Sequence, residues 1–345
     1  MPRYNFYSVI VPSFNRSEEI AELLKSFQQL NFPRERFELI VSDDGSSDDT
    51  PERVADFQRD GSFTLKLLTQ ENAGPGAARN HGMAEARGDF FIFIDSDCTV
   101  PPDWLAQIDR ALNETRADAF GGPDTLRPDF PPLLKAINYS MTSFLTTGGI
   151  RGHRKKKMGK FYPRSFNMGL SRRLFEKIGG FGNLRHGQDI EFSHRIHRSG
   201  AKVIQIMTAP VYHKRRTSLS RFFRQVFNWG VARINLYKID PGMLETVHFL
   251  PSLGVIGFLI VLALAFLSSP AGVFGRALLL FGLLLLLMSA VHGAVRYRDT
   301  RVLPLIPLVM PLQIIGYGSG FIYAFVMRVL LGRAELTGFR KKYYG

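Results

Sequence analysis

The sequence predicts an α/β head with a mostly parallel sheet, followed by an all-α membrane tail. In the first third of the chain, apolar runs that are too short for helices alternate with amphipathic segments. Alternation of this kind is typical of a parallel sheet with helices on both faces. Residues 244–345 are dominated by Leu, Ile, Val, Phe and Gly, and they hold three apolar segments long enough to cross about 30 Å of hydrocarbon.

Composition limits the range of partners. The 345 residues carry a net charge of +14, and an excess of this sign favours phosphorylated substrates, anionic lipid or nucleic acid. Because membrane spans are expected, phosphates and lipid headgroups are the preferred partners and nucleic acid is not. The single cysteine, Cys98, excludes an internal disulfide and fits a reducing compartment. The first residues lack the apolar core of a signal peptide, so the head is expected on the cytosolic side of a cell (inner) membrane.

Apolar spacing and capping residues predict the strands and helices of the head. Ser17 is the expected N-cap of the first helix, and Thr50 followed by Pro51 opens the second. The expected strands cover residues 8–12, 37–42, 63–69, 90–95, 117–122 and 201–207, and the expected helices cover 17–29, 50 onward, 74–88, 101 onward and 187–200.

Two carboxylates, Asp95 and Asp97, stand at the end of the buried strand at 90–95. Ligands of open α/β sheets bind beyond the carboxyl ends of the strands, so chemistry is expected at this point. Alternate carboxylates at a strand end suit a hard divalent cation that also binds substrate phosphates. Considered alone, the pattern is more often a polar turn that leaves the core. Its interpretation therefore depends on the rest of the chain.

A basic run follows in the second half of the head. The stretch 146–164 is rich in glycine and lysine and is expected to form a mobile loop. A solvated surface, a lid over a phosphate-bearing substrate and an anchor to anionic lipid are all open alternatives for it. Its charged residues include Arg151, Arg154, Lys155, Lys156, Lys157 and Lys160.

The tail is expected to begin with an amphipathic interfacial helix and a linker at 218–243. Residues 220–237 place apolar side chains on one arc of a helix and polar side chains on the other. Core packing is the ordinary explanation for such a stripe. Because this helix directly precedes membrane spans, however, its apolar face is expected to lie in the headgroup layer.

Three spans are expected within the membrane region 244–345, at about 247–268, 275–295 and 302–327. The arginines at 296–301 favour the cytosolic side, in agreement with a cytosolic head. Three crossings would place the basic C-terminal tail outside, against the same tendency. The third segment holds three prolines and three glycines, so a broken or re-entrant helix is an alternative to a full crossing.

Four segments of the head carry a resemblance to a known family. They are Val9-Ile10-Val11-Pro12, Val41 to Asp48, Asn72 to Asn80 and Asp95-Ser96-Asp97, in this order. Together they resemble family-2 glycosyltransferases of the GT-A fold, a Rossmann-like fold with a mostly parallel sheet. The resemblance covers residues 6–215, so we expect a glycosyltransferase domain at 1–217. It implies an inverting hexosyltransferase that uses a nucleotide-sugar donor, most often a UDP-sugar.

The resemblance also implies a donor site. Asp43 and Asp44 would read the base, with a carboxylate accepting a hydrogen bond from a ring N–H. Gly74 would allow close approach of the backbone, and Arg79 would contact the diphosphate or ribose. The implied donor-site residues are Pro12, Ser13, Asn15, Asp43, Asp44, Gly74, Arg79 and Asp95.

The implied metal site uses the same strand end. Asp97 would ligate Mg²⁺ or Mn²⁺ that bridges the diphosphate, and Asp95 would hold the ribose or the metal. The cation is needed because the leaving nucleoside diphosphate develops charge as the glycosidic bond breaks. In some relatives a histidine at the position of His213 completes the metal shell, although a single histidine is more often structural.

Asp189 is the candidate catalytic base. It opens a helix at the position of the family's acidic pair, and the helix dipole favours a carboxylate there. A base at this position would deprotonate the acceptor hydroxyl as it attacks from the face opposite the leaving group, which inverts the anomeric configuration. The family usually has Glu where this chain has Gln188. The candidate acceptor-side residues are Asn167, Gln188, Gln225 and Trp229.

The sequence leaves open which acceptor is used and whether one sugar or a polymer is transferred. Processive relatives carry Gln-x-x-Arg-Trp on an interfacial helix, whereas this chain has Asn228 between Gln225 and Trp229 where they have Arg. With few spans as well, transfer of one sugar to a lipid-linked or membrane-proximal acceptor is favoured over a polysaccharide synthase. From other classes, a nucleotidyltransferase would need a Gly-rich basic loop that residues 11–16 do not form, and a non-catalytic scaffold would use the basic run.

Overall fold

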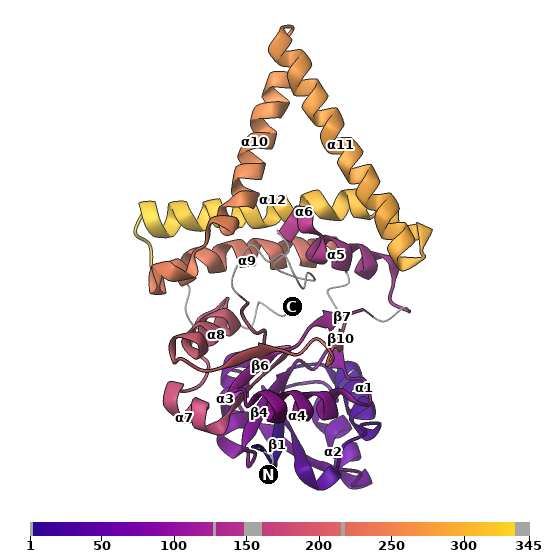
Figure 1. Cartoon of the computed structure of the whole chain (residues 1–345), viewed down its shortest axis with the longest axis vertical. Coiled ribbons are helices and arrows are strands. Elements are labelled where there is room, and N and C mark those ends of the chain that lie inside the picture. Colours follow the sequence, from indigo (N-terminus) through magenta and orange to yellow (C-terminus); the bar gives the residue numbers. More distant parts are fainter. Residues whose placement is uncertain (1–2, 127–128, 148–160, 215–217, 335–345) are drawn as a thin grey trace. The chain divides into compact units, whose positions relative to one another are not determined.

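The computed structural model describes residues 3–126, 129–147, 161–214 and 218–334 (Figure 1). The chain divides into two compact units, and each is described by itself. The head unit contains the chain up to Thr125 together with Tyr162–Lys214, and the helical unit contains Leu126–Phe161 and Arg215–Glu335. The helical unit thus includes a segment, 126–161, that the sequence analysis placed in the head. The basic residues at 151–160 lie outside the described residues.

A seven-stranded sheet forms the centre of the head unit, in the order β3-β2-β1-β4-β8-β6-β9. The four strands expected in the first third of the chain are parallel neighbours, as predicted. The strand β8 was not expected, and it lies antiparallel to β4 and to β6. The strands are β1 (Tyr7–Ser13), β2 (Phe37–Asp43), β3 (Thr64–Thr69), β4 (Phe90–Ile94), β6 (Ala119–Gly121), β8 (Asn167–Ser171) and β9 (Val203–Gln205).

The alternation of side chains along β1 explains how helices cover both faces of this sheet. Val9 and Val11 join a core cluster with α1, α2 and α4, whereas Ile10 points the other way, into a cluster with α3, α7 and α8. All three side chains are fully buried. The helices are α1 (Ser17–Gln28), α2 (Thr50–Asp60), α3 (Pro75–Glu85), α4 (Trp104–Thr115), α7 (Arg172–Ile178) and α8 (Gln188–Arg198).

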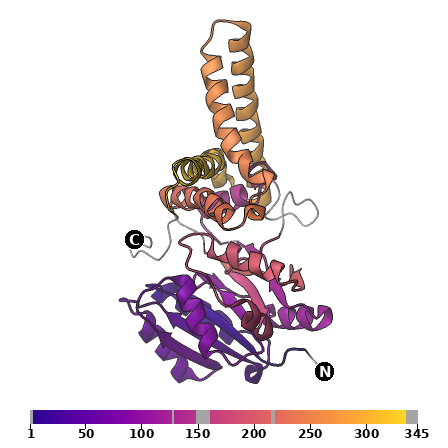
Figure 2. The same cartoon turned by 90° about the vertical axis from the view of Figure 1, so that its left-hand side faces the viewer.

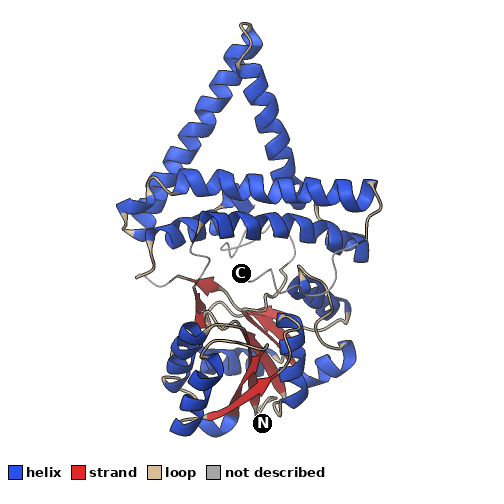
Figure 3. Ribbon diagram, turned by 180° about the vertical axis from the view of Figure 1, so that it is seen from behind, coloured by secondary structure: helices blue, strands red, loops and turns tan. Residues whose placement is uncertain are grey.

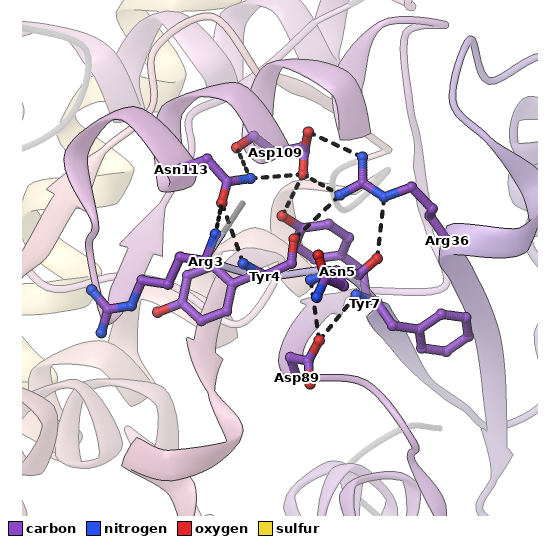
Figure 4. A network of polar contacts seen from close by, with 9 residues as sticks. Arg3, Tyr4, Asn5, Tyr7, Arg36, Asp89, Asp109 and Asn113 are labelled. Carbon is purple, nitrogen blue, oxygen red and sulfur yellow. Dashed lines mark hydrogen bonds and ion pairs between the residues drawn. The ribbon is translucent and has the colours of Figure 1, made fainter. Parts of the chain in front are cut away.

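A polar network closes the amino-terminal edge of the sheet (Figure 4). The carboxylate of Asp109 accepts hydrogen bonds from the Tyr7 hydroxyl at 2.7 Å and from the Asn113 amide at 2.9 Å, and Arg36 pairs with it at 2.8 Å. Burial, together with Asp109, raises the pKa of Tyr7 far above its ordinary value. Since Tyr7 begins β1, this network lies at the edge opposite the strand ends where ligands are expected, and its role is structural.

A second, three-stranded sheet of very short strands brings distant parts of the head together. The strand β10 (Val211–His213) runs antiparallel to β5 (Cys98–Thr99) and parallel to β7 (Asp124–Thr125). Neither β5 nor β7 was expected from the sequence, because strands of two residues have no readable period.

The helical unit contains helices and no strand among its described residues (Figure 3). Three of its helical stretches are long and apolar enough to cross a membrane, namely Thr246–Ala265, Pro270–Tyr297 and Ile306–Leu330. The helices are α5 (Pro132–Thr142), α6 (Phe144–Thr147), α9 (Leu219–Ile239), α10 (Leu250–Ala265), α11 (Pro270–Tyr297) and α12 (Ile306–Ala324), with the 3-10 turns Pro241–Met243, Thr246–Phe249 and Thr300–Val302 and a final π-helical turn, Phe325–Leu330.

The expected helix at 220–237 is present as α9, but most of its apolar face is buried within the helical unit. The side chains of Phe222, Val226 and Ile234 are fully buried. Gly230 has no room for a Cβ because the backbone of α12 lies against it. Most of this stripe therefore packs against α12, although Phe223 on the same arc is 38% exposed, and the interfacial position of α9 stays a prediction.

Candidate active site

The carboxyl ends of β1, β2 and β4 meet at one edge of the large sheet. Ser13, the last residue of β1, stands in register with Asp43, the last residue of β2. The strand β4, parallel to β1 on its other side, ends at Ile94, so Asp95 begins at the same edge. The structure therefore brings together the polar strand ends that the sequence analysis singled out.

Asp43 and Asp44 are buried, and both use their oxygens to shape loops. Asp43 accepts from the backbone N–H of Ser46 at 3.0 Å and from its hydroxyl at 2.5 Å, which closes the turn after β2. Asp44 accepts from the backbone N–H groups of Ala73 at 2.9 Å and Gly74 at 2.8 Å. A direct contact of either carboxylate with a base stays a prediction, and their observed role is to hold the walls of this edge.

The loop after β1 is tied to the loop after β2 through Asn15. Its side-chain oxygen accepts from the backbone N–H of Ser47 at 2.8 Å, and its own N–H donates to the Ser46 hydroxyl at 2.8 Å. Asn15 has a φ of 50°, a left-handed conformation that asparagine adopts more readily than most residues. Gly74, at the start of α3, has a φ of 95°, which favours glycine.

Arg79 on α3 links two of the predicted site carboxylates. Its guanidinium, 5% exposed, pairs with Asp95 at 2.5 Å and lies over the ring of Phe181. Its positive charge also lowers the pKa of Asp189. Asp95 and Asp189 therefore share the field of one buried cation, although they are far apart in the sequence.

Asp189 sits in the first turn of α8 and is ion-paired with Arg164 at 3.0 Å. It also accepts from the backbone N–H of Ile190 at 2.9 Å. Burial alone would raise the pKa of Asp189, but the charge and hydrogen bond of Arg164, with the charge of Arg79, bring it below its ordinary value. The carboxylate is thus ionised, which is the form that accepts a proton.

The small sheet assembles a second group around His213. The Nε2 atom of His213 lies 3.2 Å from Asp97, and its Nδ1 atom lies 3.6 Å from Asp124. Burial alone would lower the pKa of His213, yet the two carboxylates raise it to about 10. Asp97, Cys98 and His213 offer ligand atoms that all lie within 4.8 Å of one another.

These donors differ in how well they suit the expected cation. Carboxylate oxygen suits Mg²⁺ or Mn²⁺, so Asp97 fits. The imidazole of His213 is a less typical ligand for these ions, and because its pKa is raised to about 10 it would have to release a proton on binding one. Cys98 fits less well, because burial raises the pKa of its thiol well above the ordinary value and keeps it protonated. Asp95, also predicted as a ligand, is engaged by Arg79.

The predicted acceptor-side residues have different surroundings. The side chain of Gln188 lies directly against Gly76 of α3. Asn167 is fully buried, and its amide donates to the carbonyls of Ala209 at 2.8 Å and Pro123 at 3.2 Å, so its observed contacts are structural. Gln225 and Trp229 belong to α9 in the helical unit, and their contact with an acceptor stays a prediction.

Sequence reasoning missed Asp124 and Arg164. Asp124 lies in a two-residue strand whose pairing with β10 has no sequence signal. Arg164 closes the glycine- and lysine-rich stretch that was interpreted as a mobile loop. The sequence carries no signal for Arg164, because its pairing with Asp189, the candidate base, is visible only in the structure.

Comparison with known proteins agrees with this geometry. A family model described as glycosyl transferase family 2 matches residues 8–179. The chain is 30% identical to a protein of Bacillus subtilis that is named as a glycosyltransferase, EpsH, over 251 residues, which cover 69% of each chain. It is 38% identical over 115 residues, 33% of this chain and 37% of the relative, to a GalNAc(5)-diNAcBac-PP-undecaprenol β-1,3-glucosyltransferase of Campylobacter jejuni.

The solved structure of the mannosyltransferase PcManGT from Pyrobaculum calidifontis, in complex with GDP-Man and Mn²⁺, has the same fold. The two chains superpose with a TM-score of 0.64 at 21% sequence identity, covering 94% of this chain and 89% of that one. The chain therefore belongs to glycosyl transferase family 2 and has the GT-A fold of that family.

Proposed function

We propose that the protein is a membrane-anchored, inverting, metal-dependent glycosyltransferase that moves a sugar from a nucleotide-sugar, expected to be a UDP-sugar, to a lipid-linked or membrane-proximal acceptor. The observation that carries this proposal is the arrangement around Arg79. One buried guanidinium pairs with Asp95 at the donor edge and also lowers the pKa of Asp189 at the start of α8. A donor-side and an acceptor-side carboxylate are thereby coupled.

In the proposed reaction, the Asp189 carboxylate accepts the proton of the acceptor hydroxyl. The hydroxyl oxygen forms a bond to the anomeric carbon of the donor sugar while the bond from that carbon to the diphosphate oxygen breaks. The nucleoside diphosphate leaves with the electron pair of the broken bond, and attack from the opposite face inverts the anomeric centre. The Arg164 pair keeps Asp189 ionised and oriented before the acceptor arrives.

Asp97 and His213 would hold the divalent cation, which would neutralise charge on the leaving diphosphate. Asp124 would orient His213 through its Nδ1 atom, as carboxylates behind metal-binding histidines commonly do. Use of a divalent cation is supported by the Mn²⁺ named with the PcManGT structure. Among the described residues, Asp97 and His213 are the matching carboxylate and imidazole donors of one cluster.

The lipid-linked acceptor rests on two supports. The helical unit has three helices with the length and composition of membrane spans. The Campylobacter relative is named for an undecaprenol-linked acceptor. We also propose a cell-membrane location with a cytosolic head, supported by these helices and by the arginines at 296–301, which favour the cytosolic side.

A panel of UDP-, GDP- and dTDP-sugars with Mn²⁺ tests the proposal. Nucleotide release is measured with and without membrane lipid extract, and again after EDTA. We expect release from one donor class, stimulated by lipid and abolished by EDTA. Release that is unchanged by EDTA would overturn the metal requirement, and a lack of stimulation by lipid would overturn the acceptor class. Product length on a defined acceptor separates single transfer from polysaccharide synthesis.

A further inference from the structure

The helical unit has a hairpin, α10 and α11, that stands apart from its other helices. The two helices meet at the turn at 266–269 and diverge from it like the arms of an inverted V (Figure 1), which Figure 2 shows edge-on. Apolar side chains along both are exposed, among them Leu259, Phe258, Leu280 and Phe281, each at least 50%. The turn carries no charge. A hydrophobic hairpin of this kind needs a hydrocarbon environment on its outer faces.

The connection between the head and α5 fixes the side of the membrane on which α5 lies. Only residues 126–131 separate β7 from α5. A bilayer core is about 30 Å thick and needs about 20 apolar residues for a helical crossing, so this connection cannot cross it. The helix α5 therefore lies on the same side as the head.

Polar contacts then tie the end of α11 to α5. Lys135 of α5 pairs with Asp299 at 2.9 Å, and both side chains are less than a tenth exposed. Asn138 of α5 donates to the hydroxyl of Tyr297, the last residue of α11, at 2.7 Å. The end of α11 is consequently on the side of the head, which means that α10 and α11 cross the membrane once in each direction.

The third candidate span, α12, contacts elements on the side of the head along its whole length. Near its start, Ile306 packs in one cluster with α5, and further on Gln313 accepts from the Ser140 hydroxyl of α5 at 2.7 Å. Toward its end, Gly318 and Gly320 have no room for a Cβ against the backbone of Pro251, at the start of α10, and of Phe227 in α9. A helix that crossed the bilayer would lose contact with α5, α9 and the start of α10 after a few turns, because it would move away from the head side of the membrane.

Figures 1 and 3 show the same path for α12. The helix α12 runs alongside α9 and across the foot of the hairpin (Figures 1 and 3). In the apolar segment within Ile306–Leu330, 44% of the residues are buried within the protein, compared with 17% in the corresponding segment of each hairpin helix. Other side chains of α12, such as Leu308 and Ile315, are exposed and apolar.

We infer that α12 lies in the membrane interface beside α9, so that the chain crosses the bilayer twice and its C-terminus is on the same side as the head. The partner of the exposed face of α12 is the lipid surface itself. This inference rests on the membrane anchoring proposed above. It also removes the conflict with the positive-inside tendency, because the basic residues at the end of α11, directly after it and after α12 then share one side. These residues are Arg296, Arg298, Arg301, Arg333, Arg340, Lys341 and Lys342.

Cysteine accessibility tests the inference in the full-length protein. Cys98 is 1% exposed, so the wild-type chain serves as the unlabelled background. Single cysteines are placed at three exposed positions outside the proposed catalytic machinery, as Ser268→Cys in the hairpin turn, Thr300→Cys after α11 and Ala334→Cys after α12. A membrane-impermeant maleimide is applied to spheroplasts and to inside-out vesicles of a bacterial host, and the total for each variant is its labelling in SDS minus the wild-type signal from Cys98.

We expect Ser268→Cys to react in spheroplasts, and Thr300→Cys and Ala334→Cys to react only in inside-out vesicles. Reaction of Ala334→Cys together with Ser268→Cys would establish a third crossing and overturn the inference, while anchoring stands. Recovery of the protein in the soluble fraction after a carbonate wash would overturn anchoring itself. Nucleotide release by each variant is measured in the same vesicles, so that loss of the proposed reaction is seen separately from topology.

Discussion

Replacing Arg164 with Gln should move the acid limb of the pH–rate profile toward higher pH. The proposed base, Asp189, works as a carboxylate, and its pKa is the balance of burial, which raises it, and of the Arg164 and Arg79 charges, which lower it. Removing the Arg164 contribution while burial persists must raise the pKa of Asp189. Protonation then inactivates the base at a pH at which the wild-type enzyme is still ionised.

The size of the effect follows from the pair geometry. The Arg164 Nη1 atom lies 3.0 Å from the Asp189 carboxylate, and both side chains are less than a quarter exposed. A hydrogen bond to a charged group contributes about 1.5–3 kcal/mol. At about 1.36 kcal/mol per pH unit, the acid limb should move by about 1–2 units. Near neutral pH the rate should change much less, because Arg79 still favours the carboxylate.

The assay is kcat/KM for sugar transfer between about pH 4.5 and 8, with the donor class found above. Arg164→Lys is the matched control, since it keeps the positive charge and should leave the acid limb close to that of the wild type. An unmoved acid limb in Arg164→Gln would refute the assignment of Asp189 as the titrating base. A loss of equal size at every pH would show that Arg164 acts on substrate instead.

Three further predictions follow from the same geometry. Asp189→Asn should lower kcat by about 10²–10⁴-fold while the donor dissociation constant, measured by calorimetry, stays near that of the wild type; turnover near the wild-type rate would exclude the base. Asp97→Asn should weaken Mn²⁺ binding, followed by electron paramagnetic resonance, by at least about tenfold and by more than Asp95→Asn, since Asp97 faces His213 whereas Asp95 faces Arg79; the reverse order would contradict this. Gly320→Ala should destabilise the helical unit by about 1–3 kcal/mol, seen as a lower Tm in detergent, whereas Gly257→Ala, where nothing lies within 4 Å of the new Cβ, should not; equal Tm values would show that α9 and α12 can separate without cost.

The parallel half of the head could be predicted because its information is local. The strands β1, β2 and β4 are buried on both faces, each holds an apolar run of at least three residues, and polar residues end or follow each of them. Parallel strands bring their carboxyl ends to one edge, so strand ends far apart in sequence had to meet there. The positions of Asp43 and Asp95 followed from that rule alone.

The rest depends on long-range pairing that leaves no local pattern. The antiparallel insertion of β8 between β4 and β6 and the two-residue strands β5 and β7 have too few residues to show a period. Asp124 reaches His213 only because β7 pairs with β10. The helix α5 escaped notice for a different reason. Its side chains are buried from Leu134 through Met141, and these include the polar residues Lys135, Asn138 and Ser140, which do not look like core positions in the sequence.

The α9 stripe shows how a correct helix can be given the wrong partner. An apolar face before membrane spans reads as lipid-facing, because a sequence pattern does not distinguish lipid from another helix. Glycines decide the matter here, since Gly230 and Gly320 let the backbones of α9 and α12 approach until no Cβ fits between them, and Gly316 leaves room for the Val226 side chain. Those glycines in the third apolar segment had indicated a broken helix, whereas their observed role is close packing.

The family model ends at residue 179, before Asp189 and His213, so the matched region contains the donor edge and the two groups that complete the proposed site come from the chain beyond it. Two consecutive residues of α3 connect these parts. Arg79 pairs with Asp95 and acts on Asp189, while Asn80 exchanges two hydrogen bonds with the backbone of Phe181, at 2.8 and 3.0 Å, in the loop that precedes α8. The helix that carries the proposed base is therefore held through α3. If Asp95 and Asp189 act as proposed, one short helix couples the donor edge to the base, and a change in the donor edge that displaces α3 is expected to displace the base as well.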